Sequence, residues 1–309
     1  MSPQSLAHEN LDVVVDIIGR QNPLQKKRIR AFLSTRDDTY WDFAEALSAT
    51  LVSRLMATAA DAEATALAYN RMCMDFVKEQ IRFKKTGSYL IQDASVANEQ
   101  VYSRPEVMRN YMVSLLLTYM FWPNQYAMLQ FLDDYWQSRP VRRYLDIAPG
   151  HGLFTVKAVQ RWPDLDATVI DISETSLRVA REILEAFEID TSKIEFVHGD
   201  FLKTELPGGG FDFITMGEVL EHVNDAPEFL VRARELLNPG GALYMTTCAN
   251  CPAVDHVYHF HTVREIRDLI GGAGLQIVDE VALPAEPFPE DRWEAELVTI
   301  NYAAILKRA

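Results

Sequence analysis

Hydrophobic positions follow two different spacings along the chain, and the change lies near residue 137. Before it, apolar residues recur at helical spacing, as at Phe43, Leu47, Leu51 and Leu55. Such a stripe predicts helices that each bury one face. The Trp122-Pro123 pair is predicted to end an apolar helix, because proline lacks the backbone N–H that continues the hydrogen-bond ladder. The pattern therefore predicts an all-helical cap domain over residues 1–137.

After Arg143, short apolar runs alternate with amphipathic segments. Strands are predicted at 143–148, 167–171, 194–198, 211–216, 241–247, 275–282 and 296–306. Helices are predicted to begin near residues 152, 174, 225 and 262, with Ser173 and Thr262 as caps. The alternation predicts an α/β domain over residues 138–309, with a mostly parallel seven-stranded sheet covered on both faces. The last two strands lack a long crossover, so an antiparallel hairpin at a sheet edge is expected.

The segment YLDIAPGHGLF, residues 144–154, reads as a buried strand, a glycine turn and the start of a helix. Gly150 and Gly152 allow backbone to approach a ligand, and a helix N-terminus offers unpaired N–H groups. The next strand, ATVIDIS, ends in Asp171, near the spacing at which a nucleotide-binding fold places a carboxylate on ribose hydroxyls. These features predict binding of an adenosine-containing small molecule.

Composition narrows the partners and the compartment. The chain has 309 residues and a formal charge of −14, which argues against nucleic acid or a membrane surface as a main partner and favours a small-molecule substrate. The apolar run MVSLLLTYMF is too short to span a bilayer, and the start MSPQSLAHEN lacks the pattern of a secretory signal. Three cysteines suit a reducing compartment. A cytoplasmic location is expected.

Six segments occur together in a familiar order and spacing: LDIAPGHG, VIDIS, VHGDF, FDFITMGEVLEHV, LLNPGGALYMTT and DHVYHFHT. On these motifs, residues 144–306 resemble the class I S-adenosylmethionine (SAM)-dependent methyltransferases, which have a Rossmann-like fold. Ala148 departs from the pattern, since a glycine usually stands there. A dinucleotide oxidoreductase is disfavoured, because its third glycine is missing after Gly152.

The resemblance implies a SAM site built from Asp146, Ala148, Gly150, Gly152, Asp171, Ile172, Asp200, Phe201, Gly217 and Glu218. Asp171 is expected to accept from both ribose hydroxyls, with Ile172 on the adenine ring. Asp200 is expected to accept from the adenine amine. Gly217 and Glu218 are expected near the sulfonium. The alternative role of the two aspartates is capping or turn formation.

Five residues are candidates for the chemistry itself: Tyr119, Asn124, Tyr126, His151 and His222. His222 could act as a general base or simply orient its loop. Aromatic side chains around Pro123 could form a lid over the sulfonium, because aromatic faces attract cations. Plain packing is the alternative for them. His151 faces either the ligand or the turn that contains it.

Three functions remain open from the motifs. The first is methyl transfer to a small molecule, in specialised metabolism. The second is cyclisation, because the segment WPNQY resembles the azetidine-2-carboxylate synthases, in which the SAM amine attacks its own γ-carbon and releases methylthioadenosine. The third, a non-catalytic SAM-binding subunit, is disfavoured because the SAM-binding residues are present. A homodimer is one expectation for such enzymes.

The remaining motif has spacing that a zinc site could use: Cys248, Cys251, His256 and His259. The segment follows the fifth predicted strand, where this fold places substrate-facing residues. Pocket lining or packing is therefore favoured over ligation, and no metal is expected.

Overall fold

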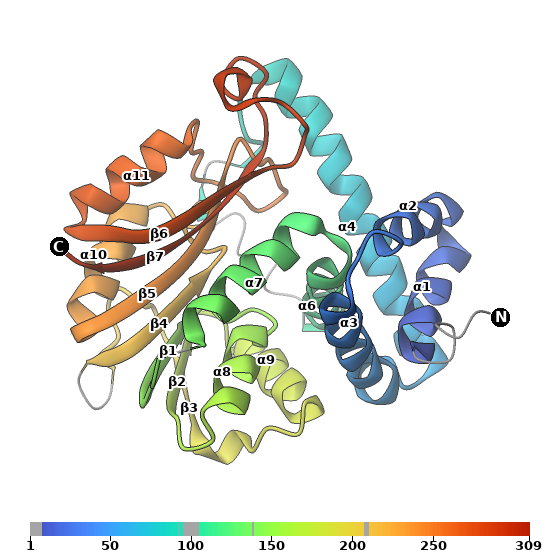
Figure 1. The fold of residues 1–309 in the computed structure, drawn as a ribbon, viewed down its shortest axis with the longest axis horizontal. Helices are drawn as coiled ribbons and strands as arrows, with labels where there is room; N and C mark the ends of the chain where they lie inside the picture. Colours follow the sequence, from blue (N-terminus) through green and yellow to red (C-terminus); the bar gives the residue numbers. More distant parts are fainter. Residues whose placement is uncertain (1–7, 92, 95–104, 138, 207–209) are drawn as a thin grey trace.

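The structure, a computed structural model, describes residues 8–91, 93–94, 105–137, 139–206 and 210–309. The first seven residues of the segment considered as a secretory signal lie outside them. A twisted sheet with its helices occupies one side of the molecule, and a group of long helices occupies the other (Figure 1).

The N-terminal region is helical, as predicted. Its α-helices are α1 (Glu9–Gln21), α2 (Pro23–Leu33), α3 (Asp38–Thr50), α4 (Ala59–Thr86), α6 (Pro105–Phe121) and α7 (Pro123–Trp136). Side-chain oxygens of Asn22, Asp37 and Thr58 accept from the first-turn N–H groups of α2, α3 and α4. Proline at position 123 ends α6 and begins α7, which confirms the predicted break. The stripe that begins at Phe43 continues past α3 into a π-helical turn, Leu51–Leu55.

Seven strands form one sheet in the order β3-β2-β1-β4-β5-β7-β6. Their bounds are β1 Arg143–Ile147, β2 Asp166–Asp171, β3 Ile194–His198, β4 Phe211–Gly217, β5 Leu237–Ala249, β6 Leu275–Pro284 and β7 Ile300–Arg308. The first five run parallel, and β7 pairs antiparallel with both β5 and β6. The mostly parallel, seven-stranded prediction is confirmed. The final antiparallel pair is also present, with β7 inserted between β5 and the edge strand β6.

The remaining α-helices are α8 (Leu153–Arg161), α9 (Glu174–Ala186), α10 (Ala226–Leu236) and α11 (Val263–Gly272). Ser173 and Thr262 cap α9 and α11 as predicted. Short 3₁₀ turns occur at Thr191–Lys193, Leu220–His222 and Glu290–Arg292.

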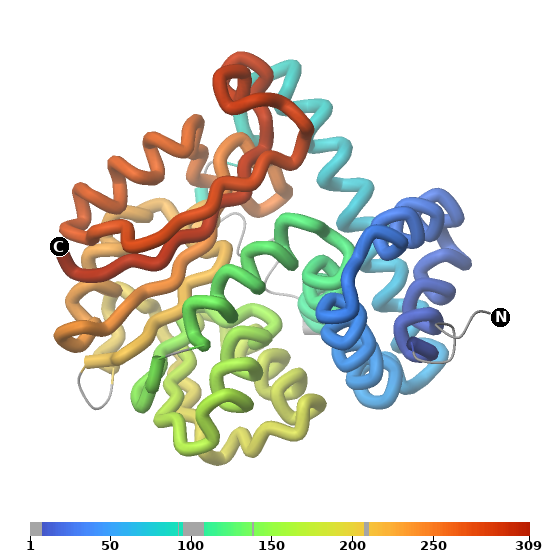
Figure 2. The backbone as a smooth tube through the Cα atoms, viewed as in Figure 1, coloured from blue at the N-terminus to red at the C-terminus, as the bar shows by residue number. Residues whose placement is uncertain are grey.

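Alternating side chains divide the core between the two faces of the sheet. Leu145, Ile214 and Met245 belong to the cluster that contains the buried residues of α10 and α11. Tyr144 and Phe213 belong to the other cluster, which contains residues of α8 and α9 and continues into the N-terminal helices. Helix α7 makes the junction, because it contacts both α6 and the strands β6 and β7 (Figure 2).

The apolar helix α6 does not meet the requirements of a membrane span, and neither does any other helix within the described ranges. Two polar side chains interrupt it, Ser114 and Thr118, and their hydroxyls donate to the carbonyl groups of Tyr111 and Leu115 one turn earlier. Both hydroxyls are therefore satisfied inside the helix.

A buried carboxylate joins β1, β4 and α8. Asp146 Oδ2 accepts from Thr155 Oγ1 at 2.6 Å, and Oδ1 accepts from Thr215 Oγ1 at 2.8 Å. Thr215 also shares a 2.6 Å hydrogen bond with the Tyr144 hydroxyl. Burial raises the pKa of Asp146 to about 6, and the hydrogen bonds oppose that rise. The network fixes the end of β1 relative to its neighbours.

We predict that Thr215→Val lowers the free energy of unfolding by about 1–3 kcal/mol, because it leaves buried oxygens of Asp146 and Tyr144 with fewer partners. Thr168→Val is the matched control. Thr168 is equally buried in β2, and its hydroxyl has no partner within the described structure, so this substitution should be neutral or stabilising. Urea unfolding of both variants is the measurement. Equal losses would contradict the role given to the network.

Candidate functional site

The turn after β1 is held in the left-handed region of the backbone. The φ angles are 50° at Ala148, 55° at Gly150 and 70° at Gly152, which is the residue before the first turn of α8. Glycine takes this conformation without strain, whereas an alanine costs about 1–2 kcal/mol. The Ala148 N–H donates to the Ile170 carbonyl at 2.8 Å, so a bond to β2 supports the strained residue.

His151 lies inside this turn and is buried. Its Nδ1 accepts from the Leu153 N–H at 3.1 Å, which leaves the proton on Nε2. Burial lowers the pKa of His151 to about 4, so the ring is neutral near pH 7. The Tyr119 ring packs edge-on against His151, with 5.1 Å between ring centroids, and also against Phe154.

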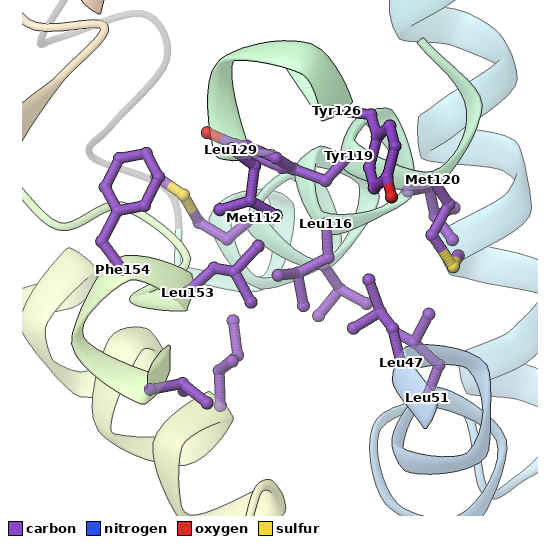
Figure 3. Packing of buried hydrophobic residues seen from close by; sticks show 14 of the residues in the cluster. Leu47, Leu51, Met112, Leu116, Tyr119, Met120, Tyr126, Leu129, Leu153 and Phe154 are labelled. Atoms are coloured by element: carbon purple, nitrogen blue, oxygen red, sulfur yellow. The ribbon is translucent and has the colours of Figure 1, made fainter. Parts of the chain in front are cut away.

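Helix α6 covers the glycine turn. The sulfur of Met112 would lie 3.6 Å from a Cβ built on Gly150. Met112, Leu116 and Tyr119 project from α6 toward Leu153 and Phe154 of α8 (Figure 3). The structure thus brings Tyr119 and His151 together over the predicted SAM loop.

Asp171 ends β2, next to the glycine turn. Its Oδ1 accepts from the Ser173 N–H at 2.7 Å. Burial raises the pKa of Asp171 to about 7, and the bond from Ser173 opposes the rise. The following residue, Ile172, is 61% exposed. A carboxylate and an apolar surface therefore stand side by side at this strand end.

Asp200 follows β3 and has local partners. Its Oδ1 accepts from the Leu202 N–H at 2.9 Å, and Oδ2 lies 2.7 Å from the Lys203 Nζ. The hydrogen bond from Lys203 lowers the pKa of Asp200. Phe201 is buried and packs on Phe229. The turn-forming role of Asp200 is thus present, which leaves its adenine role a prediction.

Gly217, the last residue of β4, and Glu218, which follows it, are each constrained by their surroundings. A Cβ on Gly217 would lie 2.4 Å from Cε2 of Phe154, so only glycine fits beside that ring. Glu218 has a φ of 52°, and its N–H donates to Thr246 Oγ1 at 2.9 Å. Burial raises the pKa of Glu218, and its Oε1 has no partner among the described residues.

His222 lies beyond Glu218 in the 3₁₀ turn Leu220–His222. Its Nδ1 donates to the Asp255 carbonyl at 3.1 Å, on the loop after β5. The neighbouring Glu221 is fully buried, and its Oε2 accepts from Thr247 Oγ1 at 2.7 Å. Burial raises the pKa of Glu221 well above its usual range. This pair joins the loops that follow β4 and β5.

Asn124 and Tyr126 have partners elsewhere. Asn124 Nδ2 donates to the Leu283 carbonyl and to Asn301 Oδ1, both at 3.0 Å. Tyr126 packs edge-on against Tyr40, with 4.9 Å between ring centroids, and also contacts Phe43. These hydrogen bonds and ring contacts lie away from the glycine turn, so the catalytic roles of Asn124 and Tyr126 stay predictions. Trp122, part of the predicted lid, packs edge-on against Phe76 of α4.

The four residues with zinc-site spacing do not all come together in the fold. The ligand atoms of Cys248, Cys251 and His256 lie within 4.8 Å of one another and are buried. His259 has other partners: it stacks on Tyr89 and shares a 2.9 Å hydrogen bond with Asn250 Oδ1.

A cavity of about 330 Å³ lies between α4, α6 and the loop 253–255. Its lining is mainly apolar and includes Met72, Phe76 and Tyr111, with Arg71, Asp75 and Asp255 as charged residues. Asp255 thus reaches both this cavity and His222. A second cavity, of about 420 Å³, lies over residues 257–260 and α11.

Residues 145–241 match the family model described as a methyltransferase domain. The chain contains a class I SAM-dependent methyltransferase domain. Its seven-stranded sheet, with the antiparallel β7 between β5 and β6, has the order of that fold.

Curated relatives share this domain. The ubiquinone/menaquinone biosynthesis C-methyltransferase UbiE of Dinoroseobacter shibae is 29% identical over 119 residues, 38% of this chain and 47% of that protein. The ubiquinone biosynthesis O-methyltransferase of Acinetobacter baylyi is 25% identical over 193 residues, 56% of this chain and 80% of that protein. The chain spans about half the length of several curated relatives that it matches.

A solved structure shares the fold beyond the domain. The O-methyltransferase family protein from Burkholderia thailandensis aligns with a TM-score of 0.54 at 18% identity, over 80% of this chain and 72% of that one. The alignment therefore reaches into the N-terminal helices.

Sequence reasoning missed two groups of residues at the site. The first is the cover over the glycine turn, in particular Met112, because nothing in the sequence specifies which face of α6 meets the methyltransferase domain. The second is the set of partners around Glu221, including Thr247 and Asp255. The EVLEH segment signalled this group, but the loop that meets it comes from more than thirty residues later.

The raised pKa of Asp171 predicts a pH dependence of stability. The ordinary value is 3.8 and the folded value is about 7, so the folded protein holds this proton over a wider range than the unfolded chain. Asp171 should therefore contribute a negative slope to the free energy of unfolding as pH rises between about 4 and 7, and no slope above that range. Asp171→Asn should make that slope shallower in urea unfolding of the ligand-free protein.

Asp200→Asn is the control of opposite sign, because the pKa of Asp200 is lowered. It should leave the slope between pH 4 and 7 intact. An unchanged slope in Asp171→Asn would contradict the burial assigned to this carboxylate.

Proposed function

We propose that this protein transfers a methyl group from SAM to a small molecule. The observation that carries the proposal is the position of the glycine turn and Asp171 at the same end of two adjacent parallel strands. Ile147 of β1 is in register with Ile170 of β2, so the two strand ends meet at one edge of the sheet. Small molecules bind at this edge in open α/β folds.

The residues fit SAM chemically. A carboxylate has about four acceptor sites, and the hydrogen bond to Asp171 within the described residues comes from Ser173, so capacity remains for two ribose hydroxyls. Exposed Ile172 offers an apolar surface to adenine, and Asp200 offers an acceptor to its amine. At the other end, the buried unpartnered oxygen of Glu218 suits a cationic group.

SAM supplies an electrophilic methyl group on a sulfonium. The chain itself has to align the reactants and exclude water. We assign that task to Met112 and Tyr119, which cover the glycine turn from α6. His151 stays neutral there and does not repel the cation. His222 has a positioning role in this proposal, because it donates a hydrogen bond to the loop after β5. Asn124 and Tyr126 are assigned structural roles, because their partners lie away from the glycine turn.

We place the acceptor in the cavity between α4, α6 and the loop 253–255. Its mainly apolar lining, with a few charged groups, suits a small molecule with an apolar body. In this account, residues 1–137 act as a cap domain that shapes the acceptor site. A role in specialised metabolism, a cytoplasmic location and a homodimer stay predictions.

The test is product analysis by mass spectrometry. The native protein is incubated with SAM alone, and then with SAM and a panel of small phenols and amines. S-adenosylhomocysteine that appears only with an acceptor supports methyl transfer. Methylthioadenosine and a cyclic amino acid from SAM alone would replace it with cyclisation. Binding without either product would leave only a SAM-binding subunit.

Asp171→Asn should weaken SAM binding about tenfold or more, because hydrogen bonds to a charged group contribute about 1.5–3 kcal/mol each. Asp166→Asn is the matched control, since Asp166 begins the same strand at its opposite end and pairs with Arg143. Calorimetric titration of both variants is the measurement. Equal affinities would remove Asp171 from the site.

A further inference from the structure

Two histidines and a glutamate meet where β4 and β5 end. Glu221, His222 and His256 each offer a ligand atom, and these atoms lie within 4.8 Å of one another. Glu221 and His256 are buried, and the rings of His222 and His256 cross at nearly a right angle, with 4.7 Å between centroids. The set joins the turn after β4 to the loop after β5.

Hydrogen bonds fix the tautomer of both histidines. Nδ1 of His222 lies 3.1 Å from the Asp255 carbonyl oxygen, and Nδ1 of His256 lies 2.6 Å from the Cys251 carbonyl oxygen. A carbonyl only accepts, so each Nδ1 carries a hydrogen and Nε2 is the nitrogen through which a metal ion would be held. Backbone carbonyls orient metal-binding imidazoles in this way.

The carboxylate of the set lacks compensation. Oε2 of Glu221 accepts from Thr247, while Oε1 is buried and has no partner within the described structure. Glu218 also has an unpartnered Oε1, and the two glutamates belong to one cluster within 4.8 Å. Buried carboxylates of this kind are costly unless a proton or a cation neutralises them.

We propose that Glu221, His222 and His256 form a binding site for a divalent transition-metal cation such as Zn²⁺. Two imidazoles and one carboxylate are ligands that such cations accept, and three protein ligands leave a coordination position open. Glu218 lies beside the set, in an overlapping cluster with Glu221 and Cys248. On the proposed function, an oxygen or nitrogen of the acceptor would fill the open position.

The neighbouring cysteines form a poorer set. His256 faces Cys248 Sγ at 3.8 Å through Nδ1, and that nitrogen already donates to the Cys251 carbonyl. Coordination with the two thiolates through Nδ1 would break this bond. Coordination through Nε2, on the other side of the ring, keeps it.

Metal binding is tested on the full-length protein, with Zn²⁺ and Co²⁺ as probes. The reduced protein is stripped with a chelator, dialysed and titrated by calorimetry. We expect saturation at one metal ion per chain, with a Co²⁺ spectrum that shows ligand-field bands and no thiolate charge-transfer band. Glu221→Gln and His256→Asn should each weaken binding at least about tenfold, in line with losses at other metal sites.

Two variants serve as matched controls. His261→Asn removes an exposed histidine that contacts Glu265 outside the set, and Cys251→Ser removes a thiol. Both should bind Zn²⁺ like the native protein. Absence of stoichiometric metal in the native protein would overturn the proposal, even if the variants fail to fold. A thiolate band that disappears in Cys251→Ser would also overturn it, in favour of the cysteine set.

Discussion

A fully buried carboxylate holds the sheet together where β1 ends. Asp146 can be accommodated at the end of β1 only because hydroxyls of Thr155 and Thr215 donate to it from α8 and β4. Those two bonds fix β1, β4 and α8 relative to one another, at the point between β1 and β4 where the strand order reverses. The glycine turn starts two residues later, so its left-handed backbone is built on a rigid base.

The same edge is closed from above by the N-terminal helices. One hydrophobic cluster runs from Tyr144 and Phe213 in the sheet through α7 and α6. The helices are therefore packed against the methyltransferase domain, and α6 supplies Met112 and Tyr119 to the turn. Close packing between Phe154 and Gly217 restricts the site from the side.

Much of the fold could be predicted because its signals are local. Alternation of short apolar runs with amphipathic helices predicted the sheet, and Ser173 and Thr262 predicted helix starts through side-chain oxygens that reach the next turn. The proline at position 123 predicted a helix break, because it lacks the backbone N–H that continues the hydrogen-bond ladder. By contrast, β5 begins at Leu237, before the predicted start at residue 241, because Leu237 pairs with Phe211 of the neighbouring strand β4.

The site was less accessible to sequence reasoning because it depends on tertiary contacts. Tyr119, Asn124 and Tyr126 lie close together in the sequence, and a shared lid was a natural interpretation. The three side chains point to different partners in the folded protein. Tyr119 contacts His151 in the glycine turn, whereas Asn124 contacts Leu283 and Tyr126 contacts Tyr40. The association of Glu221 with His256 has the same origin, since it arises only when the loops after β4 and β5 meet.

The most direct measurement is a crystal structure of the protein with S-adenosylhomocysteine bound. We predict that both ribose hydroxyls lie within hydrogen-bonding distance of Asp171 and that the amino-acid portion lies along Gly150 and Gly152. A ligand bound elsewhere, with Asp171 engaged by Ser173 alone, would contradict it.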